Sequence, residues 1–179
     1  MGFKYAIRTD RLHFLTHTVV DWVDLFTRRE LGMIVVDSLN YCVEKKGLEI
    51  YAWCLMPSHL HLIASVLPGN PAGLSDVMRD FKRFTSKTLL AGIDHEFESR
   101  REWLKKRFER GGGEHQVWKE GMHPIELYSG KFITQKLNYI HMNPVVAGIV
   151  DEPEHYVFSS ARDYMTKRKG LVEISYING

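Results

Sequence analysis

The feature that most constrains this fold is a pair of apolar segments separated by only two residues. Residues 48–56 have the sequence LEIYAWCLM, residues 59–66 have HLHLIASV, and Pro57-Ser58 lies between them. Proline and serine are turn formers, so the sequence predicts two antiparallel strands joined by a tight turn. The uncharged stretch Ile50–Ser75 contains this hairpin, but two histidines and three prolines interrupt it. A membrane helix is excluded, because it would have to hide two imidazoles and a proline near its middle.

A strand and a helix are predicted before the hairpin. Residues 11–20 are rich in β-formers and predict a strand. Thr27 followed by Glu30 has the spacing of a capping box, which predicts that a helix begins there. Gly47 is expected to end that helix as a C-terminal cap. The helix has an apolar stripe of 3.6-residue period: Leu31, Ile34, Val35, Leu39, Cys42 and Val43.

Two helices and a strand are predicted after the hairpin. Ser75 is expected to cap a helix over 76–90, a second helix is expected over 98–110, and residues 115–119 are expected to form a strand. The inward stripe of the first helix is predicted as Val77, Phe81, Phe84 and Thr88. The order strand, helix, hairpin, helix, strand is typical of an α+β fold with a ferredoxin-like, RRM-like antiparallel sheet. Helices are expected on one face of this sheet, with the other face open.

A last helix is expected over 129–143. Ile133, Leu137 and Ile140 would face inward, and Pro144 is expected to end the helix, because the residue before a proline disfavours helical geometry. The whole chain, 1–179, is expected to form one domain, with its core in about residues 11–165.

Composition narrows the class of protein. The 179 residues are 44% hydrophobic and 26% charged, which excludes a disordered chain or a linker. The formal net charge of +2 neither demands nor excludes a nucleic-acid partner. Two cysteines, Cys42 and Cys54, do not make a disulfide scaffold and are interpreted as reduced core residues. The N-terminal residues lack an apolar signal region, so a cytoplasmic location is expected.

His59 and His61 are the first candidates for chemistry. Alternate residues of a strand point to the same face, so the two imidazoles should project side by side, opposite to Leu60 and Leu62. Two imidazoles at this spacing can share one metal ion. The alternative is two histidines on a half-exposed strand, and the pair alone does not decide between them.

The helix over 129–143 carries the second set of candidates. Tyr139 and Asn143 are four residues apart and lie on one helical face, with Lys136 three residues before the tyrosine on the same side. A phenol can act as a nucleophile on a phosphate that a metal polarises, and an amide oxygen can bind Mg²⁺ or Mn²⁺. The alternative is a packed tyrosine and a helix-terminal asparagine.

Two blocks together, LMPSHLHLIAS and LNYIHMNPVVAGIV, carry a family resemblance. They resemble the single-tyrosine HUH transposases of bacterial insertion sequences, and are most similar to the REP-associated tyrosine transposase branch. In that branch the first block is close to M-P-N-H-V-H-L and the second to Y-I-x-x-N-P-V-x-A-G. A further P-E-D-Y-x-x-S-S pattern is matched in part by Pro153, Glu154, Tyr156, Ser159 and Ser160. The resemblance spans about residues 11–165.

The resemblance implies roles for individual residues. His59 and His61 match the metal-binding histidines, Tyr139 matches the nucleophile, and Asn143 matches the polar residue that completes the metal site. Ser58 stands where asparagine is common, and we expect that change to leave metal binding undisturbed. The implied cofactor is Mg²⁺ or Mn²⁺. The implied reaction is nicking and strand transfer of single-stranded DNA at hairpin elements through a 5′-phosphotyrosine intermediate. The protein could act as a monomer or as a homodimer.

A basic stretch suggests where DNA would bind. Residues 79–110 hold ten Lys or Arg and six Asp or Glu, an excess of four against two for the whole chain. Arg79, Arg83 and Lys87 recur on one helical face, with Lys82 beside them, and such a face suits phosphates. The alternative is an ordinary solvated helix face. Trp118 could stack on an unpaired base or belong to the core.

Two other functions remain compatible with these residues. One is a catalytically silent module that binds hairpin DNA or RNA. The other is a metal-dependent hydrolase that uses water as its nucleophile and does not need Tyr139.

Overall fold

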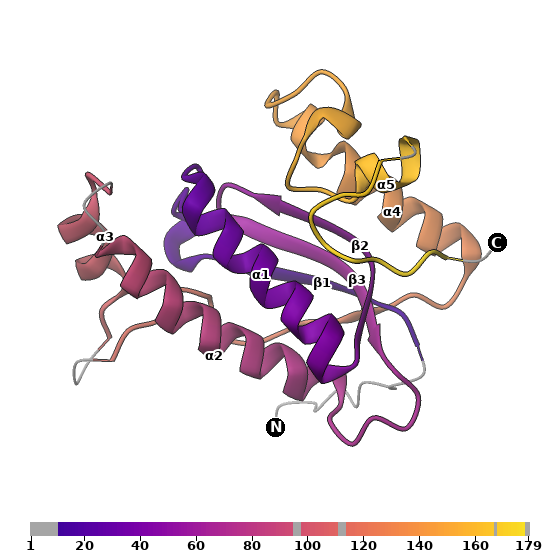
Figure 1. The fold of residues 1–179 in the computed structure, drawn as a ribbon, viewed down its shortest axis with the longest axis horizontal. Helices are drawn as coiled ribbons and strands as arrows, with labels where there is room; N and C mark the ends of the chain where they lie inside the picture. Colours follow the sequence, from indigo (N-terminus) through magenta and orange to yellow (C-terminus); the bar gives the residue numbers. More distant parts are fainter. Residues whose placement is uncertain (1–10, 95–97, 111–113, 167, 178–179) are drawn as a thin grey trace.

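The computed structural model describes residues 11–94, 98–110, 114–166 and 168–177. Its centre is a four-stranded antiparallel sheet in the order β2-β3-β1-β4 (Figure 1). The strands are β1 (His13–Thr18), β2 (Leu48–Met56), β3 (His59–Val66) and β4 (Ile125–Glu126). This strand order, with a helix between β1 and β2 and another after β3, is ferredoxin-like, so the predicted fold class is confirmed.

The hairpin forms with the predicted bounds. Met56 pairs with His59 at its tip, and the register shifts once, between Ile50 and Ala52. On the other side of β3, strand β1 pairs Thr16 with His61. β3 is thus hydrogen-bonded on both edges, which fixes the direction of its side chains.

Helices α1 (Arg29–Lys46) and α2 (Leu74–Ile93) cover one face of the sheet (Figure 1). The large core between these helices and the sheet includes Leu60, Leu62, Ala64 and Val66 of β3. Gly47 ends α1 with a left-handed φ of 65°, as expected for a glycine cap. Cys42 and Cys54 are both buried and unpaired, as expected.

Both predicted N-terminal caps are wrong. Helix α1 has Arg28 at its cap position, and Thr27 instead donates its hydroxyl to the carbonyl of Asp24. Helix α2 begins before Ser75, with Gly73 as a cap that offers no side chain. The end of a short connection determines where each helix begins, and a capping pattern does not include that constraint.

The predicted inward stripe of α2 is partly wrong. Val77 and Phe81 are buried, but Phe84 is 61% exposed and Thr85 takes the buried position one turn after Phe81. The next buried residue after Phe81 is therefore four positions on, at Thr85. The sequence predicts Phe84, three positions on, because Phe84 is apolar.

The segment after α2 also differs from expectation. Helix α3 (Arg101–Phe108) is shorter than the predicted 98–110. Residues 115–119 form no strand and make only isolated bridges, Glu109 with His115 and Val19 with Trp118. The fourth strand is β4, which pairs with His13 and Phe14. It has only two residues and little apolar alternation, so the sequence gives no strand signal there.

The second face of the sheet is not open, which corrects the prediction. Helix α4 (Gly130–Val146) packs on it (Figure 1). Ile140 of this helix joins Phe14, Cys54 and Ile63 in a smaller apolar cluster. The predicted inward stripe is confirmed, because Ile133 and Leu137 pack against this cluster. Pro144 does not end α4 but lies inside it, near its end. A proline there removes one hydrogen bond of the last turn, and the amide of Ala147 still bonds to the carbonyl of Asn143.

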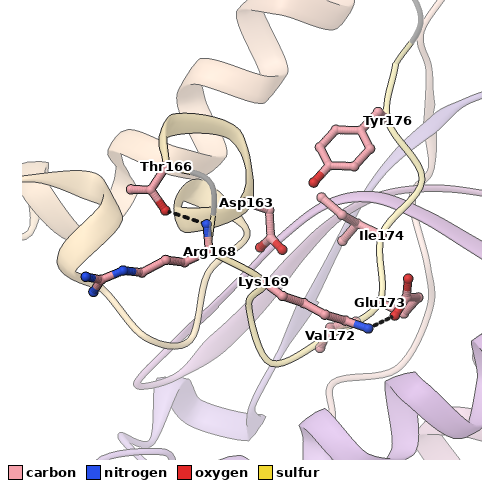
Figure 2. A pocket seen from close by; sticks show the side chains of 8 residues that line it. All are labelled: Asp163, Thr166, Arg168, Lys169, Val172, Glu173, Ile174 and Tyr176. Carbon is pink, nitrogen blue, oxygen red and sulfur yellow. Dashed lines mark hydrogen bonds and ion pairs between the residues drawn. The ribbon is translucent and has the colours of Figure 1, made fainter.

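After α4 come two short helices, η3 (Pro153–His155) and α5 (Ala161–Met165), and then a C-terminal tail. The tail amide of Ser175 donates to the carbonyl of Ile50 in β2. Figure 2 shows a hollow that the tail forms with α5, in which Lys169 pairs with Glu173. None of the expected site residues lines this hollow. Among the described residues, no helix has the length and apolar character to span a membrane.

Candidate active site

The two histidines of β3 point to the α4 face of the sheet, as predicted. Their neighbours Leu60 and Leu62 point into the core under α1 and α2. The ring centroids of His59 and His61 are 4.7 Å apart. The two imidazoles are therefore adjacent, as a shared metal ion requires.

His61 has one nitrogen in contact and one left over. Its Nδ1 lies 2.9 Å from the hydroxyl oxygen of Thr16 in β1. Its Nε2 is buried and has no hydrogen-bond partner among the described residues. Burial, helped by the nearby His59, Lys136 and His17, lowers the pKa of His61 to about 3. The ring is thus neutral at pH 7, the form that binds metals, and Nε2 is the atom that lacks a partner.

His59 is held in a similar way. Its Nδ1 lies 3.2 Å from the hydroxyl oxygen of Ser58, the residue before it. Burial lowers the pKa of His59, although the charge of Asp24 opposes this shift. The hydroxyl of Ser58, the residue that stands where asparagine is common, thus contacts one of the two histidines. Partners of this kind orient the ring of a metal-binding histidine.

Tyr139 projects from α4 toward the same two rings. Its ring centroid is 5.3 Å from that of His61 and 5.9 Å from that of Phe14, both in edge-on geometry. The side chain is 49% exposed, so a ligand can reach it. The ammonium nitrogen of Lys136 lies 5.6 Å from the centre of the Tyr139 ring and 4.6 Å from that of Phe14. A cation, a phenol and two neutral imidazoles therefore occupy one small region.

Asn143 follows Tyr139 by one helical turn and is half-buried. Its side chain makes no hydrogen bond to any described residue, so its amide remains available. Within the described part of the chain, no cluster of three or more His, Cys, Asp or Glu could hold a metal ion. A third ligand would have to be of another type, such as an amide oxygen. His59, His61 and Asn143 would suit a divalent cation, and the unpartnered Nε2 of His61 is the observation that supports this fit.

The expected DNA-binding residues of α2 are not beside this site, because α2 packs on the opposite face of the sheet. Arg79 pairs with Asp76 and lies 4.0 Å from Asp80. The ammonium of Lys82 donates to the carbonyls of Lys119 and Gly121, so it holds that loop. Arg83 and Lys87 are exposed and make no ion pair with a described residue. Of the predicted basic residues, Lys136 alone adjoins Tyr139.

Trp118 belongs to the core, the second of the two alternatives for this residue, and it is not available to stack on DNA. It is 1% exposed, and its indole nitrogen donates to the hydroxyl of Thr85 at 2.8 Å. Its ring stacks on that of Phe26 at 5.5 Å. No base can reach a ring enclosed in this way.

Three residues near the candidate site stand in none of the sequence motifs. Thr16 and Phe14 come from β1, and strand alternation predicts that they share a face but not that β1 lies beside His61. Trp22 is 56% exposed, and its ring centroid is 5.5 Å from that of His59. The only available signal for Trp22 was its place directly after Asp21 and two residues before Asp24, an unusual place for a core residue.

Comparisons with known proteins complete these observations. A family model described as IS200-like transposase matches residues 24–121, more than half of the chain. That range contains His59 and His61 but not Tyr139 or Asn143. No curated protein matches the chain.

Nine solved chains match this one. A REP-associated tyrosine transposase solved with a bound REP hairpin is 16% identical, with a TM-score of 0.66, over all of this chain and 94% of that one. A candidate transposase from Deinococcus radiodurans is 18% identical, with a TM-score of 0.49, over 78% of this chain and 94% of that one. At these identities the first likeness shows a shared fold.

Proposed function

This chain belongs to the family of IS200-like transposases, and we propose that it nicks and transfers single-stranded DNA at hairpin elements through Tyr139. The observation that carries this proposal is the approach of the exposed Tyr139 ring to His61, at 5.3 Å between centroids. A tyrosine that served only the core would be expected to turn its ring into the apolar cluster with Ile140. Here the ring lies at the edge of that cluster, against the candidate metal ligands.

The proposed metal site consists of His59, His61 and Asn143, with Mg²⁺ or Mn²⁺ as the cation. When bound, the cation would draw negative charge from the non-bridging oxygens of the phosphate and orient it for in-line attack. Thr16 and Ser58 orient the two imidazoles through their Nδ1 atoms, so that each Nε2 would offer its lone pair to the cation. Because His61 is already neutral, binding requires no loss of a proton from it.

The covalent step uses groups of the chain itself. The phenolate oxygen of Tyr139 attacks phosphorus, the bond from phosphorus to the 3′ oxygen breaks, and that oxygen takes up a proton. The products are a 5′-phosphotyrosine link and a free 3′-hydroxyl. The ammonium of Lys136, near the Tyr139 ring, stabilises negative charge on the phenolate and the phosphate. Attack by another 3′-hydroxyl reverses the step and transfers the strand without an external energy source.

The proposal includes a hairpin in single-stranded DNA as the substrate. The structural relative with the same fold was solved with a REP hairpin bound. We also propose that Tyr139 acts on phosphates held by the histidines of its own chain, since the ring already lies beside His61. A homodimer is then not needed to complete the site.

The test is a cleavage assay with labelled single-stranded hairpin oligonucleotides, in Mg²⁺, in Mn²⁺ and in EDTA. We expect a denaturation-resistant protein–DNA band that depends on the metal and disappears in Tyr139→Phe. The matched control is Tyr128→Phe, which removes a hydroxyl from an exposed tyrosine just before α4. Its band should equal that of the wild type.

Other outcomes would assign a different function. Hairpin binding without a band in any metal, over a wide oligonucleotide pool, would favour the silent binding module. Cleavage that survives in Tyr139→Phe would favour a hydrolase with a water nucleophile. To test action within one chain, Tyr139→Phe is mixed with His61→Ala. A band restored by the mixture would show that the tyrosine acts on a partner's histidines instead.

A further inference from the structure

Trp22 lies beside the candidate site in a backbone conformation that tryptophan rarely adopts. It belongs to the short helical turn η1 (Val20–Trp22), directly after the residue that follows β1. Asp21 and Trp22 have φ values of 54° and 58°, and they are the only described residues other than glycine with positive φ. Each such residue typically costs about 1–3 kcal/mol. Two in succession persist only where the surrounding structure imposes them.

Hydrogen bonds on both sides of Trp22 impose this conformation. The amide of Val19 donates to the carbonyl of Ser58 at 2.8 Å, and the amide of Phe26 donates to that of Pro57 at 2.9 Å. The amide of Val20 donates to the carbonyl of Val117 at 2.8 Å. The turn that carries Trp22 is therefore fastened to the hairpin tip that carries His59. Burial of Val19 and Val20 reinforces these bonds.

The strain presents the indole to solvent instead of burying it. Trp22 is 56% exposed, although Val20 before it and Val23 after it both belong to the large core under α1 and α2. One neighbour of the ring is His59, at 5.5 Å between centroids and 74° between planes. The other is the ammonium nitrogen of Lys119, 5.0 Å from the ring centroid. An exposed aromatic ring thus stands between a candidate metal ligand and a cation.

This arrangement suits an unpaired nucleotide. Bases stack on aromatic side chains, and a lysine beside the ring can move to the adjoining phosphate. The hollow next to Trp22 is lined by Arg107, Arg110 and Lys119 but also by three acids, so charge alone does not mark a path for the DNA backbone. The feature that suits a base is the exposed ring of Trp22. Because this ring lies beside His59, it can contact only a nucleotide near the reacting phosphate.

We propose that Trp22 is a stacking platform that holds an unpaired base next to the phosphate at the His59–His61 site. Lys119 contacts a phosphate of the same nucleotide. This proposal rests on the proposed function for the identity of the ligand, single-stranded DNA, and adds a positioning residue to it.

The experiment uses the full chain carrying Tyr139→Phe, so that binding is measured without covalent attachment. Hairpins carry 2-aminopurine at each unpaired flanking position in turn, on both sides of the stem. We expect quenching at one flanking position, its loss in Trp22→Leu and its retention in Trp22→Phe. Trp22→Leu should weaken binding of flanked hairpins roughly 5- to 150-fold, the range expected for one stacked base. Hairpins without flanks should bind all variants equally.

Tyr41→Leu is the matched control, because Tyr41 is 55% exposed on α1, which covers the opposite face of the sheet. It should leave quenching and affinity unchanged. Thermal melting checks that each variant is folded. If Trp22→Leu is not, Trp22→Asn replaces it, because asparagine tolerates the positive φ of this position and offers no aromatic ring. Equal quenching in Trp22→Leu and its parent would overturn the proposal. So would an equal loss of affinity for flanked and unflanked hairpins, which indicates a structural role.

The two proposals fail in different ways. If the wild-type chain forms the covalent band but 2-aminopurine is quenched equally with and without Trp22→Leu, only the role proposed for Trp22 is wrong. If Trp22-dependent quenching occurs but no band forms in any metal, the stacking site stands and the proposed catalysis fails. If no hairpin binds to the parent at all, both fail.

Discussion

The two faces of the sheet have different chemistry, although the same strands supply both. Under α1 and α2 the β3 residues Leu60, Leu62 and Ala64 join a large apolar core. On the α4 side, β3 contributes His59 and His61, and the apolar cluster around Ile140 is much smaller. Strand alternation makes this division possible, because adjacent residues of one strand point to opposite faces. One face can then stabilise the fold while the other bears polar groups that a core would not tolerate.

Neighbouring residues of β3 allow the sharpest test of this division. His61→Ala should reduce covalent attachment by on the order of 10³-fold, since loss of one group that stabilises transition-state charge typically costs about 10²–10³. Its effect on stability should be small, because the buried Nε2 of His61 lacks a partner and its removal offsets the cavity. The band assay and urea unfolding measure the two quantities. A large loss of stability with retained activity would contradict the assignment of this face to chemistry.

Leu62→Ala is the reciprocal change, one residue further along and on the other face. Leu62 is fully buried, so its truncation should reduce the free energy of unfolding by about 2–5 kcal/mol. Covalent attachment per folded molecule should stay within about twofold of wild type. Urea unfolding measures the stability. The assay for the covalent protein–DNA band, done without urea so that the variant is folded, measures the activity. If Leu62→Ala also abolished attachment, the two faces would be coupled and the comparison would fail.

The elements predicted best are those that local patterns specify fully. The hairpin of β2 and β3 has its predicted bounds because a two-residue turn leaves little freedom in register. Gly47 was predicted to end α1 because its left-handed conformation is a local property. The caps at Thr27 and Ser75 were wrong because tertiary connections determine where those helices begin. Pro144 was expected to end α4, but a proline near a helix end removes only one hydrogen bond.

The site could be predicted only as separate parts. The motifs singled out His59, His61, Tyr139 and Asn143 as candidates, and the structure brings the ring of Tyr139 to that of His61. The covering of the second face by α4 was missed, because an apolar stripe indicates burial without naming its partner. The two alternatives for Trp118 could not be separated for the same reason, since its enclosure by Phe26 and Thr85 depends on distant contacts. Thr16 lies beside His61 through strand pairing, and Trp22 lies beside His59 because hydrogen bonds fasten its turn to the hairpin tip. The sequence alone specifies neither contact.

Thr16 lies on the α4 side of the sheet, beside His61, and its substitution is expected to have a smaller effect. Thr16→Val keeps the shape of the side chain but removes the hydroxyl that contacts Nδ1 of His61. Loss of such an orienting partner typically lowers metal affinity about 10–100-fold. The affinity for Mn²⁺ is measured by calorimetric titration, or from the Mn²⁺ concentration that gives half of the maximal covalent attachment. Thr18→Val, on the same face of β1 but opposite His59 in register, is the control. Equal affinities in the wild type and Thr16→Val would remove Thr16 from the site.

The last test concerns a polar group on the apolar face, with no expected effect on the chemistry at neutral pH. His17 points into the core against Phe81 and Trp118, and neither ring nitrogen has a hydrogen-bond partner among the described residues. Burial, with a smaller contribution from the charge of Lys82, lowers the pKa of His17 to about 3 from its ordinary 6.5. Between these values the unfolded chain binds a proton that the folded chain does not. His17 therefore leaves the free energy of unfolding unchanged above pH 6.5. As the pH drops from 6.5 toward 3, it lowers the free energy of unfolding by up to about 1.4 kcal/mol per pH unit.

His17→Leu should remove that part of the pH dependence. Urea unfolding between pH 7.5 and 4.5 measures the slope, which should decrease by roughly one proton per molecule. A residual slope is expected, because burial also lowers the pKa of His61 to about 3 and that of His141 to about 4. His61→Ala, which removes a titrating group from the other face, should reduce the slope by a similar amount while abolishing attachment. His17→Leu should leave attachment at pH 7.5 intact. If it abolished attachment there, His17 would serve the chemistry, and the faces of this sheet would not be separate in function.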